Sequence, residues 1–296
     1  MSPSLRIEKC PAAFARTLAA QGTVAIRWLG QAGFFIHWNG LDLMIDPYLS
    51  DSLARKYKGT QLPHLRGMAI PIQPQAVRNL DWVLCTHRHS DHMDPDTLAA
   101  LAQANPGCRF VVPRAEREQA LAIGVPPERT FLVNADEELK LSETASLKVV
   151  ASAHEQLRVN SQGEHHYLGY ILSLGGIRLY HSGDCVPYDR LADDLRVRPI
   201  DVALLPINGR SAYLSSRGVP GNFSFDEAVA LCRAAQIPIL IGHHWGMFEF
   251  NTADLDEVRA KIANQGPWVS FYLPTIEEAY LLSKPAAFFS GQENTA

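Results

Sequence analysis

The sequence has few cysteines, no long apolar run and no large excess of charge of one sign. Five cysteines occur among its 296 residues, and no two of them form a C-x-x-C pair. An odd number without paired spacing is typical of free thiols in a reducing compartment rather than of a disulfide framework. A chain of this length can bury most of its apolar surface, so it needs no cross-links. We therefore expect a cytoplasmic protein.

Long apolar segments are also missing. No run approaches the roughly 18 residues that a membrane-spanning helix requires, and the charged N-terminus lacks the continuous apolar segment of a signal peptide. The formal net charge is −4, whereas domains that bind nucleic acid usually have a basic balance. We therefore expect neither membrane nor nucleic-acid binding.

Strands dominate the first part of the chain and alternate with helices in the later part. This order predicts an α/β protein with two sheets packed between helices, formed as one domain over residues 1–296. Three segments are expected to lie outside this regular pattern. They are a helical N-terminal extension, a basic loop on the substrate side without clear periodicity, and a C-terminal tail: residues 1–22, 48–75 and 285–296.

Four potential metal ligands lie within six residues, directly after a predicted buried strand. The apolar run Trp82–Thr86 is followed by the hexamer His87-Arg88-His89-Ser90-Asp91-His92. Imidazole binds zinc and similar ions at neutral pH, and a carboxylate adds charge and can bridge two ions. Such a density of ligands is improbable by composition alone. The hexamer therefore predicts a metal site at the carboxyl end of a strand, where open α/β sheets place their sites.

One loop cannot complete two coordination shells, so further ligands should come from other strand ends. His154, Asp184 and the pair His243-His244 each follow an apolar run. Each of them alone would more often be a hydrogen-bonded structural residue. Together with the hexamer they become candidates for the remaining ligands. The spacing leaves open whether His243 or His244 is the last ligand.

The order of these motifs is similar to that of the metallo-β-lactamase superfamily, and within it the chain resembles the L-ascorbate-6-phosphate lactonase family. The matching stretches lie between about residues 23 and 250: W-L-G-Q-A-G-F (28–34), T-H-R-H-S-D-H-M-D (86–94), L-Y-H-S-G-D (179–184), D-V-A-L (201–204) and I-G-H-H-W (241–245). The resemblance implies a four-layer αββα sandwich. The chain departs from that family in a shorter basic loop and in G-R-S-A-Y after D-V-A-L, so the two need not share a substrate.

The resemblance also implies how the ligands divide between two divalent ions, either zinc or manganese. It gives two sets and a bridging carboxylate: His87, His89 and His154; Asp91, His92 and the terminal histidine; and Asp184 as the bridge. The G-x-H-[W/Y/H] frame of similar sequences selects His244, which precedes Trp245, as the terminal ligand. His181 in H-S-G-D is then expected to lie behind the ligands.

This ligand set predicts direct hydrolysis. Two ions that share a hydroxide lower the pKa of that water to about 7, which gives a nucleophile at neutral pH. Asp91 is the expected catalytic residue, because it can bind an ion and orient the hydroxide. The resemblance to the lactonase family implies a small-molecule substrate, a lactone or related ester of an anionic sugar acid, with or without a phosphate. The residues considered for binding it are Arg66, Arg210, Asn208 and His166, with Arg55, Lys56 and Lys58 as further candidates.

Two alternatives remain open from the sequence. The superfamily also cleaves phosphodiesters, so a phosphodiesterase is the second interpretation. A non-catalytic metal-binding scaffold or sensor is the third, and the intact ligand set argues against it, since such descendants tend to lose ligands. Similar lactonases form oligomers, and a homo-oligomer is compatible with this resemblance.

Overall fold

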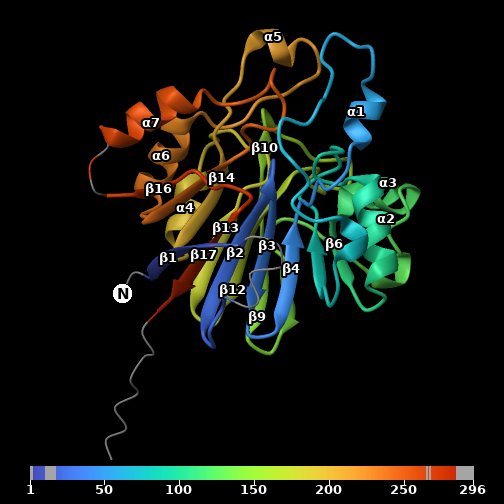
Figure 1. The fold of residues 1–296 in the computed structure, drawn as a ribbon, viewed down its shortest axis with the longest axis horizontal. Helices are drawn as coiled ribbons and strands as arrows, with labels where there is room; N and C mark the ends of the chain where they lie inside the picture. Colours follow the sequence, from blue (N-terminus) through green and yellow to red (C-terminus); the bar gives the residue numbers. More distant parts are fainter. Residues whose placement is uncertain (1–2, 11–17, 265, 267, 285–296) are drawn as a thin grey trace, which may run out of the picture.

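The computed structural model describes residues 3–10, 18–264, 266 and 268–284, and most of its strands belong to two large sheets (Figure 1). The strands are β1 (Ser4–Lys9), β2 (Thr23–Gly30), β3 (Gly33–Trp38), β4 (Leu41–Ile45), β5 (Trp82–Leu84), β6 (Arg109–Pro113), β7 (Thr130–Val133), β8 (Glu138–Ser142), β9 (Ala145–Ala151), β10 (Ala153–His154), β11 (Gln156–Leu157), β12 (Leu168–Leu174), β13 (Ile177–His181), β14 (Val202–Pro206), β15 (Ile239–His243), β16 (Ser270–Tyr272) and β17 (Glu278–Ser283). The first sheet has the order β1-β17-β2-β3-β4-β5-β6-β7, and the second has the order β16-β15-β14-β13-β12-β9-β8.

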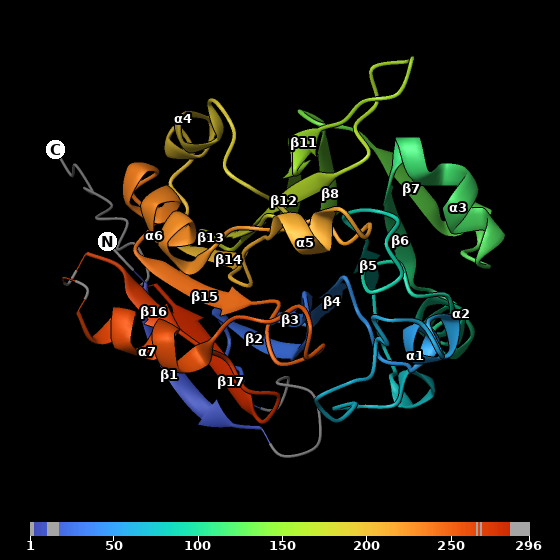
Figure 2. The same ribbon diagram turned by 90° about the horizontal axis from the view of Figure 1, so that it is seen from above.

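Helices connect the strands and cover the outer faces of the two sheets. They are α1 (Ser52–Lys56), α2 (Pro95–Ala104), α3 (Arg117–Ala122), α4 (Leu191–Arg196), α5 (Ala212–Ser215), α6 (Phe225–Ala234) and α7 (Leu255–Ala263), with short 3-10 turns at Pro74–Ala76, Arg114–Glu116 and Pro127–Arg129. Figure 2 shows α2 and α3 on one side of the molecule and α4, α6 and α7 on the other. None of the described helices is long and apolar enough to cross a membrane.

Three apolar layers hold the sheets and helices together. The central layer lies between the sheets and joins residues such as Ile26 and Leu43 of the first sheet to Leu147 and Leu204 of the second. The outer face of the first sheet packs on α2 and α3, and that of the second packs on α4, α6 and α7. Central strands are thus buried on both faces, which explains why they read as continuous apolar runs. The predicted αββα sandwich is confirmed.

The metal-binding hexamer lies in the connection from β5 to α2. Helix α2 begins after Asp94, whose carboxylate accepts hydrogen bonds from the backbone N–H and the hydroxyl of Thr97 and so caps the helix. The hydroxyl of Ser52 donates to the same carboxylate, which fixes the start of α1 beside the end of the hexamer loop. One capping residue therefore joins the hexamer loop to α1.

Two expectations about the ends of the chain have different outcomes. The helical extension expected for residues 1–22 is wrong over Ser4–Lys9, which form β1 and pair antiparallel with β17. Residues 11–17, on which that helix chiefly depended, lie outside the described residues, and so does the expected tail.

The segment 48–75, expected as a loop, is not wholly irregular. It contains α1, and a 3-10 turn begins at its end.

Candidate metal centre

The candidate ligands lie at neighbouring strand ends of the two large sheets and of the small sheet that β10 and β11 form. The hexamer residues follow β5 in the first sheet. His154 ends β10, Asp184 follows β13 and His244 follows β15. Strands β13, β14 and β15 are parallel to one another, so their carboxyl ends meet at one edge. The site therefore forms only where the two sheets face each other.

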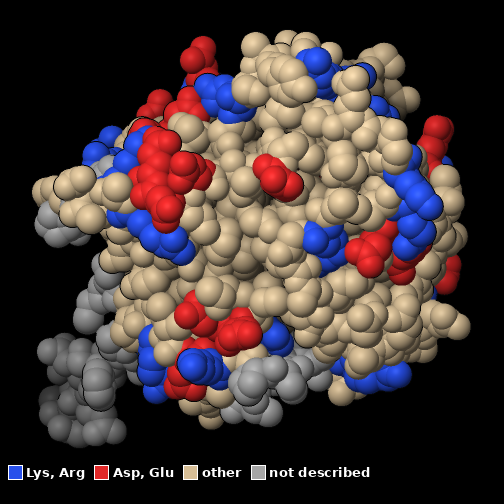
Figure 3. All heavy atoms as spheres, turned by 45° about the horizontal axis from the view of Figure 1, so that its top comes forward, with Lys and Arg blue, Asp and Glu red and all other residues tan. Residues whose placement is uncertain are grey.

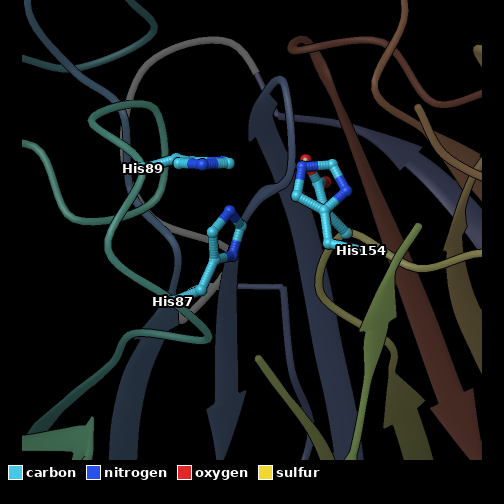
Figure 4. A group of neighbouring side chains, drawn as sticks. His87, His89 and His154 are labelled. Carbon is cyan, nitrogen blue, oxygen red and sulfur yellow. Dashed lines mark ion pairs between the residues drawn. The ribbon is translucent and has the colours of Figure 1, made fainter. Parts of the chain in front are cut away.

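A first group of ligands consists of His87, His89, His154 and Asp184. Ligand atoms of these four residues lie within 4.8 Å of one another. Figure 4 shows the three imidazole rings gathered around a common space, with His154 entering from the side opposite His87 and His89. The His154 Nε2 atom lies 3.5 Å from Asp184 Oδ2. Three histidines and one carboxylate are a ligand set that zinc accepts.

A second group consists of Asp91, His92 and His244, whose ligand atoms also lie within 4.8 Å of one another. The Nε2 atoms of His92 and His244 lie 3.3 and 3.4 Å from the two carboxylate oxygens of Asp184. Asp184 thus faces both groups, as a bridging ligand would. His243 stacks on His181 instead, with ring centroids 5.0 Å apart. The structure therefore brings His244, not His243, to the second group.

Unpaired polar atoms test whether these residues fit cations. His87 Nε2, His92 Nε2 and Asp184 Oδ1 are buried and have no hydrogen-bond partner. His92 Nε2 and Asp184 Oδ1 lie 3.3 Å apart, within ion-pair distance but without hydrogen-bond geometry. Each buried polar atom left unpaired costs roughly 1–3 kcal/mol. Cations in the two groups would satisfy these atoms, and imidazole with carboxylate is a donor set for zinc or manganese. The residues fit divalent ions.

Burial and charge set the protonation states in the metal-free chain. Burial lowers the pKa of His89 to about 4 and that of His87 well below its ordinary value. Both rings are therefore neutral at neutral pH, which is the form that binds a metal ion. Burial alone would also lower the pKa of His92. The carboxylates of Asp184 and Asp46 outweigh it and hold this pKa well above its ordinary value. A cation in the second group would take the place of that proton.

Asp46 supports the second group from behind and was missed by the sequence analysis. It is fully buried, and its Oδ2 atom lies 2.7 Å from His92 Nδ1. The same carboxylate accepts hydrogen bonds from the backbone N–H and the hydroxyl of Thr86, at 2.8 and 2.6 Å. This arrangement directs Nε2 of His92 toward the site. A signal was available, because Asp46 directly follows strand β4, as the ligands follow theirs.

A cavity of about 620 Å³ opens over both groups. The only acidic side chains among its described lining residues are Asp91 and Asp184, whereas Lys56, Arg88 and Arg217 contribute positive charge. Leucine, tyrosine and phenylalanine side chains form an apolar wall: Leu53, Tyr57, Leu62 and Phe248. On the molecular face in Figure 3, acidic and basic groups of the described residues lie interspersed, with neutral surface between them. Positive charge close to the ligands favours an anionic ligand.

The Arg66 side chain, expected to bind substrate, does not line this cavity. Its guanidinium donates to the backbone carbonyls of Tyr48 at 3.0 Å and Ser50 at 3.3 Å. A partly buried guanidinium needs such acceptors because it cannot release its charge. Arg66 therefore fastens two stretches of the segment between β4 and β5 to each other, which corrects the expectation from sequence.

The other three residues expected at the substrate also lie outside the cavity lining. Each is held by a partner within the protein: Arg210 by Glu227, Asn208 by Asn251, and His166 by Glu116. Of the further basic candidates, only Lys56 lines the cavity. Arg88 and Arg217 line it as well, although no sequence pattern had marked them for substrate binding. A basic residue inside the ligand hexamer was the available signal for Arg88.

Comparisons with known proteins agree with this geometry. A family model described as "Beta-lactamase superfamily domain" matches residues 43–245. A relative from Escherichia fergusonii, named "Probable L-ascorbate-6-phosphate lactonase UlaG", is 25% identical over 268 residues, and the match covers 81% of this chain and 74% of the relative.

Solved structures share the fold at lower identity. A metallo hydrolase from the archaeon Ignicoccus hospitalis is 19% identical, with a TM-score of 0.65, and the match covers 89% of this chain and 100% of that one. An isothiocyanate hydrolase from Delia radicum gut bacteria is 17% identical, with a TM-score of 0.68, covering 86% of this chain and 97% of that one. These likenesses show the fold alone.

Proposed function

Because the chain belongs to the metallo-β-lactamase superfamily of metal-dependent hydrolases, we propose that it opens a lactone or related ester of an anionic sugar acid, with or without a phosphate. One observation carries the proposal: two groups of metal-ligating residues share a cavity with three cationic side chains. The lactonase relative supports the lactone class, and the cations support a negative charge on the substrate.

Two divalent ions, zinc or manganese, would be held by the residues of both groups: His87, His89, His154, Asp91, His92, His244 and Asp184. Such ions lower the pKa of water and polarise a carbonyl or phosphoryl oxygen. Asp91 lines the cavity with 17% of its side chain exposed, so its carboxylate can accept a proton from an attacking water. The reaction needs no covalent intermediate on the protein.

The three cations hold the anionic part of the substrate. Lys56 comes from α1, Arg88 from the hexamer, and Arg217 follows α5, so they approach the cavity from different segments. The Arg217 guanidinium stacks on the ring of Tyr213 at 3.8 Å from its centroid, which limits its rotation. A phosphate or carboxylate placed among these side chains would leave the reacting ester bond over the ligand groups.

The setting is proposed to be the cytoplasm. All five cysteines are free thiols and are buried, which suits a reducing compartment.

Metal content and turnover should be measured together on the purified, reconstituted protein. We expect two ions per chain and opening of sugar-acid lactones, with phosphorylated lactones preferred. Exposed charge contacts contribute up to about 1 kcal/mol each, so replacing all three cations (Lys56→Gln, Arg88→Gln, Arg217→Gln) should raise KM for an anionic lactone by roughly 10- to 100-fold. Arg55→Gln is the matched control, since Arg55 lies in α1 and pairs with Asp96 outside the cavity lining.

Three results would count against the proposal. Cleavage of phosphodiesters alone would favour a phosphodiesterase of the same superfamily. Bound ions without turnover on any substrate would favour a scaffold or sensor. A reconstituted protein without bound ions would remove the basis for metal-dependent hydrolysis.

A further inference from the structure

The geometry points to one more member of the metal centre, Gln31. We propose that its side-chain amide positions Asp91 and so sets the affinity for the ion held by the second group. This inference rests on the proposed function only in assuming that divalent ions bind there. It concerns a positioning residue, because Gln31 is not one of the ligands.

The backbone of Gln31 is fixed to the segment that carries His244. Gln31 lies in the turn between β2 and β3 with a φ of 51°, and it is fully buried. Its carbonyl oxygen accepts a hydrogen bond from the His244 backbone N–H at 2.9 Å and another from the Trp28 indole at 2.9 Å. A residue other than glycine keeps such a φ only when its surroundings hold it there. These bonds use the main chain, so they survive replacement of the side chain.

The side chain of Gln31 reaches two of the three ligands in the second group. Its Nε2 atom donates a hydrogen bond to Asp91 Oδ2 at 2.9 Å and lies 3.0 Å from His244 Nε2. Among the described contacts, none joins Gln31 to the three histidines of the first group. The influence of this amide is therefore confined to one of the two ion sites.

The amide is an unusual choice if stability alone is considered. The Oε1 atom of Gln31 is buried and has no hydrogen-bond partner. A side chain with an unpaired buried oxygen costs free energy that an apolar side chain of the same size would not. The amide group does suit a site that must hold cations. It donates to a carboxylate without adding positive charge, whereas a lysine or arginine here would repel the ion.

Gln31 and Asp46 act from different directions on the same group. Asp46 holds the Nδ1 side of His92, while Gln31 contacts Asp91 and His244. The side chains of Asp46 and Gln31 thus hold His92 and Asp91, and the backbone carbonyl of Gln31 holds the segment of His244. Such supporting partners typically change metal affinity by about 10- to 100-fold when they are removed.

The test titrates zinc into the metal-free full chain and measures each binding step by calorimetry. In Gln31→Met, which keeps the length but not the donor, one binding step should weaken roughly 10- to 100-fold, while the other stays unchanged. Gln119→Met is the matched control, because Gln119 lines the same cavity and contacts no ligand among the described hydrogen bonds. In a His92→Ala background, Gln31→Met should produce no further loss, which assigns the affected step to the second group.

Several outcomes would overturn the inference while leaving metal binding intact. They are two unchanged steps in Gln31→Met, two steps weakened equally, or an added loss in the His92→Ala background. If Gln31→Met does not fold, the test uses the wild-type protein instead. NMR then follows the side-chain amide resonance of Gln31 during the zinc titration. It should shift when zinc fills one site and not the other, and its indifference to both would refute the inference. A wild-type chain that binds no zinc would instead overturn the proposed function, and this inference with it.

Discussion

Replacing Asp46 with asparagine isolates the contribution of a buried carboxylate that is not itself a candidate ligand. Asp46 lies 2.7 Å from His92 Nδ1 and accepts two hydrogen bonds from Thr86. Asparagine keeps the size of the side chain but exchanges one acceptor oxygen for an amide group. That group cannot accept from the imidazole, so the ring of His92 loses the partner that directs Nε2 toward the site.

The loss in ion affinity can be estimated from the one hydrogen bond that His92 loses. A hydrogen bond to a charged group contributes about 1.5–3 kcal/mol, and 1.4 kcal/mol corresponds to about a factor of ten in affinity. The ion of the second group should therefore bind roughly 10- to 100-fold more weakly in Asp46→Asn. The ion of the first group should be unaffected, since Asp46 contacts none of its histidines among the described hydrogen bonds.

In the metal-free protein, the effect of Asp46→Asn on stability should depend on pH. Because the pKa of His92 is raised in the folded chain, its proton stabilises the fold fully below pH of about 6.5, the ordinary pKa of histidine. That stabilisation is lost as the pH rises through the higher folded pKa. Asp46 is one of the carboxylates that raise it. Asp46→Asn should therefore cost more stability at about pH 6 than above the folded pKa.

Thermal unfolding at about pH 6 and at a pH above the folded pKa of His92 measures the effect on stability. Stepwise metal titration measures the effect on ion affinity. Asp42→Asn is a matched control, because Asp42 is also buried and lies 2.6 Å from a histidine ring, His37, at a distance from the ligands. It should lower stability and leave both metal affinities unchanged. The reasoning fails if Asp46→Asn binds both ions as the wild type does, or if Asp42→Asn weakens the second ion to the same extent.

Two further predictions concern Arg66 and the cysteines. Arg66→Met should lower the free energy of unfolding in urea by about 1–3 kcal/mol, because the guanidinium bonds to backbone carbonyls; a raised KM with unchanged stability would restore the substrate role expected from sequence. Burial raises the pKa of Cys185 to about 11 and that of Cys108 to about 12, so these thiols stay protonated at about pH 8. Ellman's reagent should therefore label the native chain slowly and all five cysteines after denaturation, and fast labelling of the native chain would contradict this.

The ligands could be anticipated from sequence because each carries a local signal. An apolar run predicts a buried strand, and a histidine or aspartate directly after it lies at the strand end. This rule locates the hexamer as well as His154 and Asp184. The same rule applies to Asp46, which directly follows β4.

The remaining features depend on contacts between segments that are distant in the sequence. Gln31 acquires its role only when the β2–β3 turn meets the end of β15. Arg66 and Arg217 are both basic loop residues, and only the tertiary structure decides that the first bonds to carbonyls while the second lines the cavity. Strand β1 lacks a continuous apolar run because it is an edge strand, and its pairing with β17 joins opposite ends of the chain.

The division of the ligands between two sheets gives metal capture a fixed place in biosynthesis. The hexamer follows β5 in the first sheet, whereas His244 follows β15 in the second, near the end of the chain. During synthesis the N-terminal part emerges first and cannot assemble the complete centre. Ions held by residues of both sheets would therefore add their full stability only after the second sheet has docked. A loaded centre would then mark a chain whose two large sheets have docked.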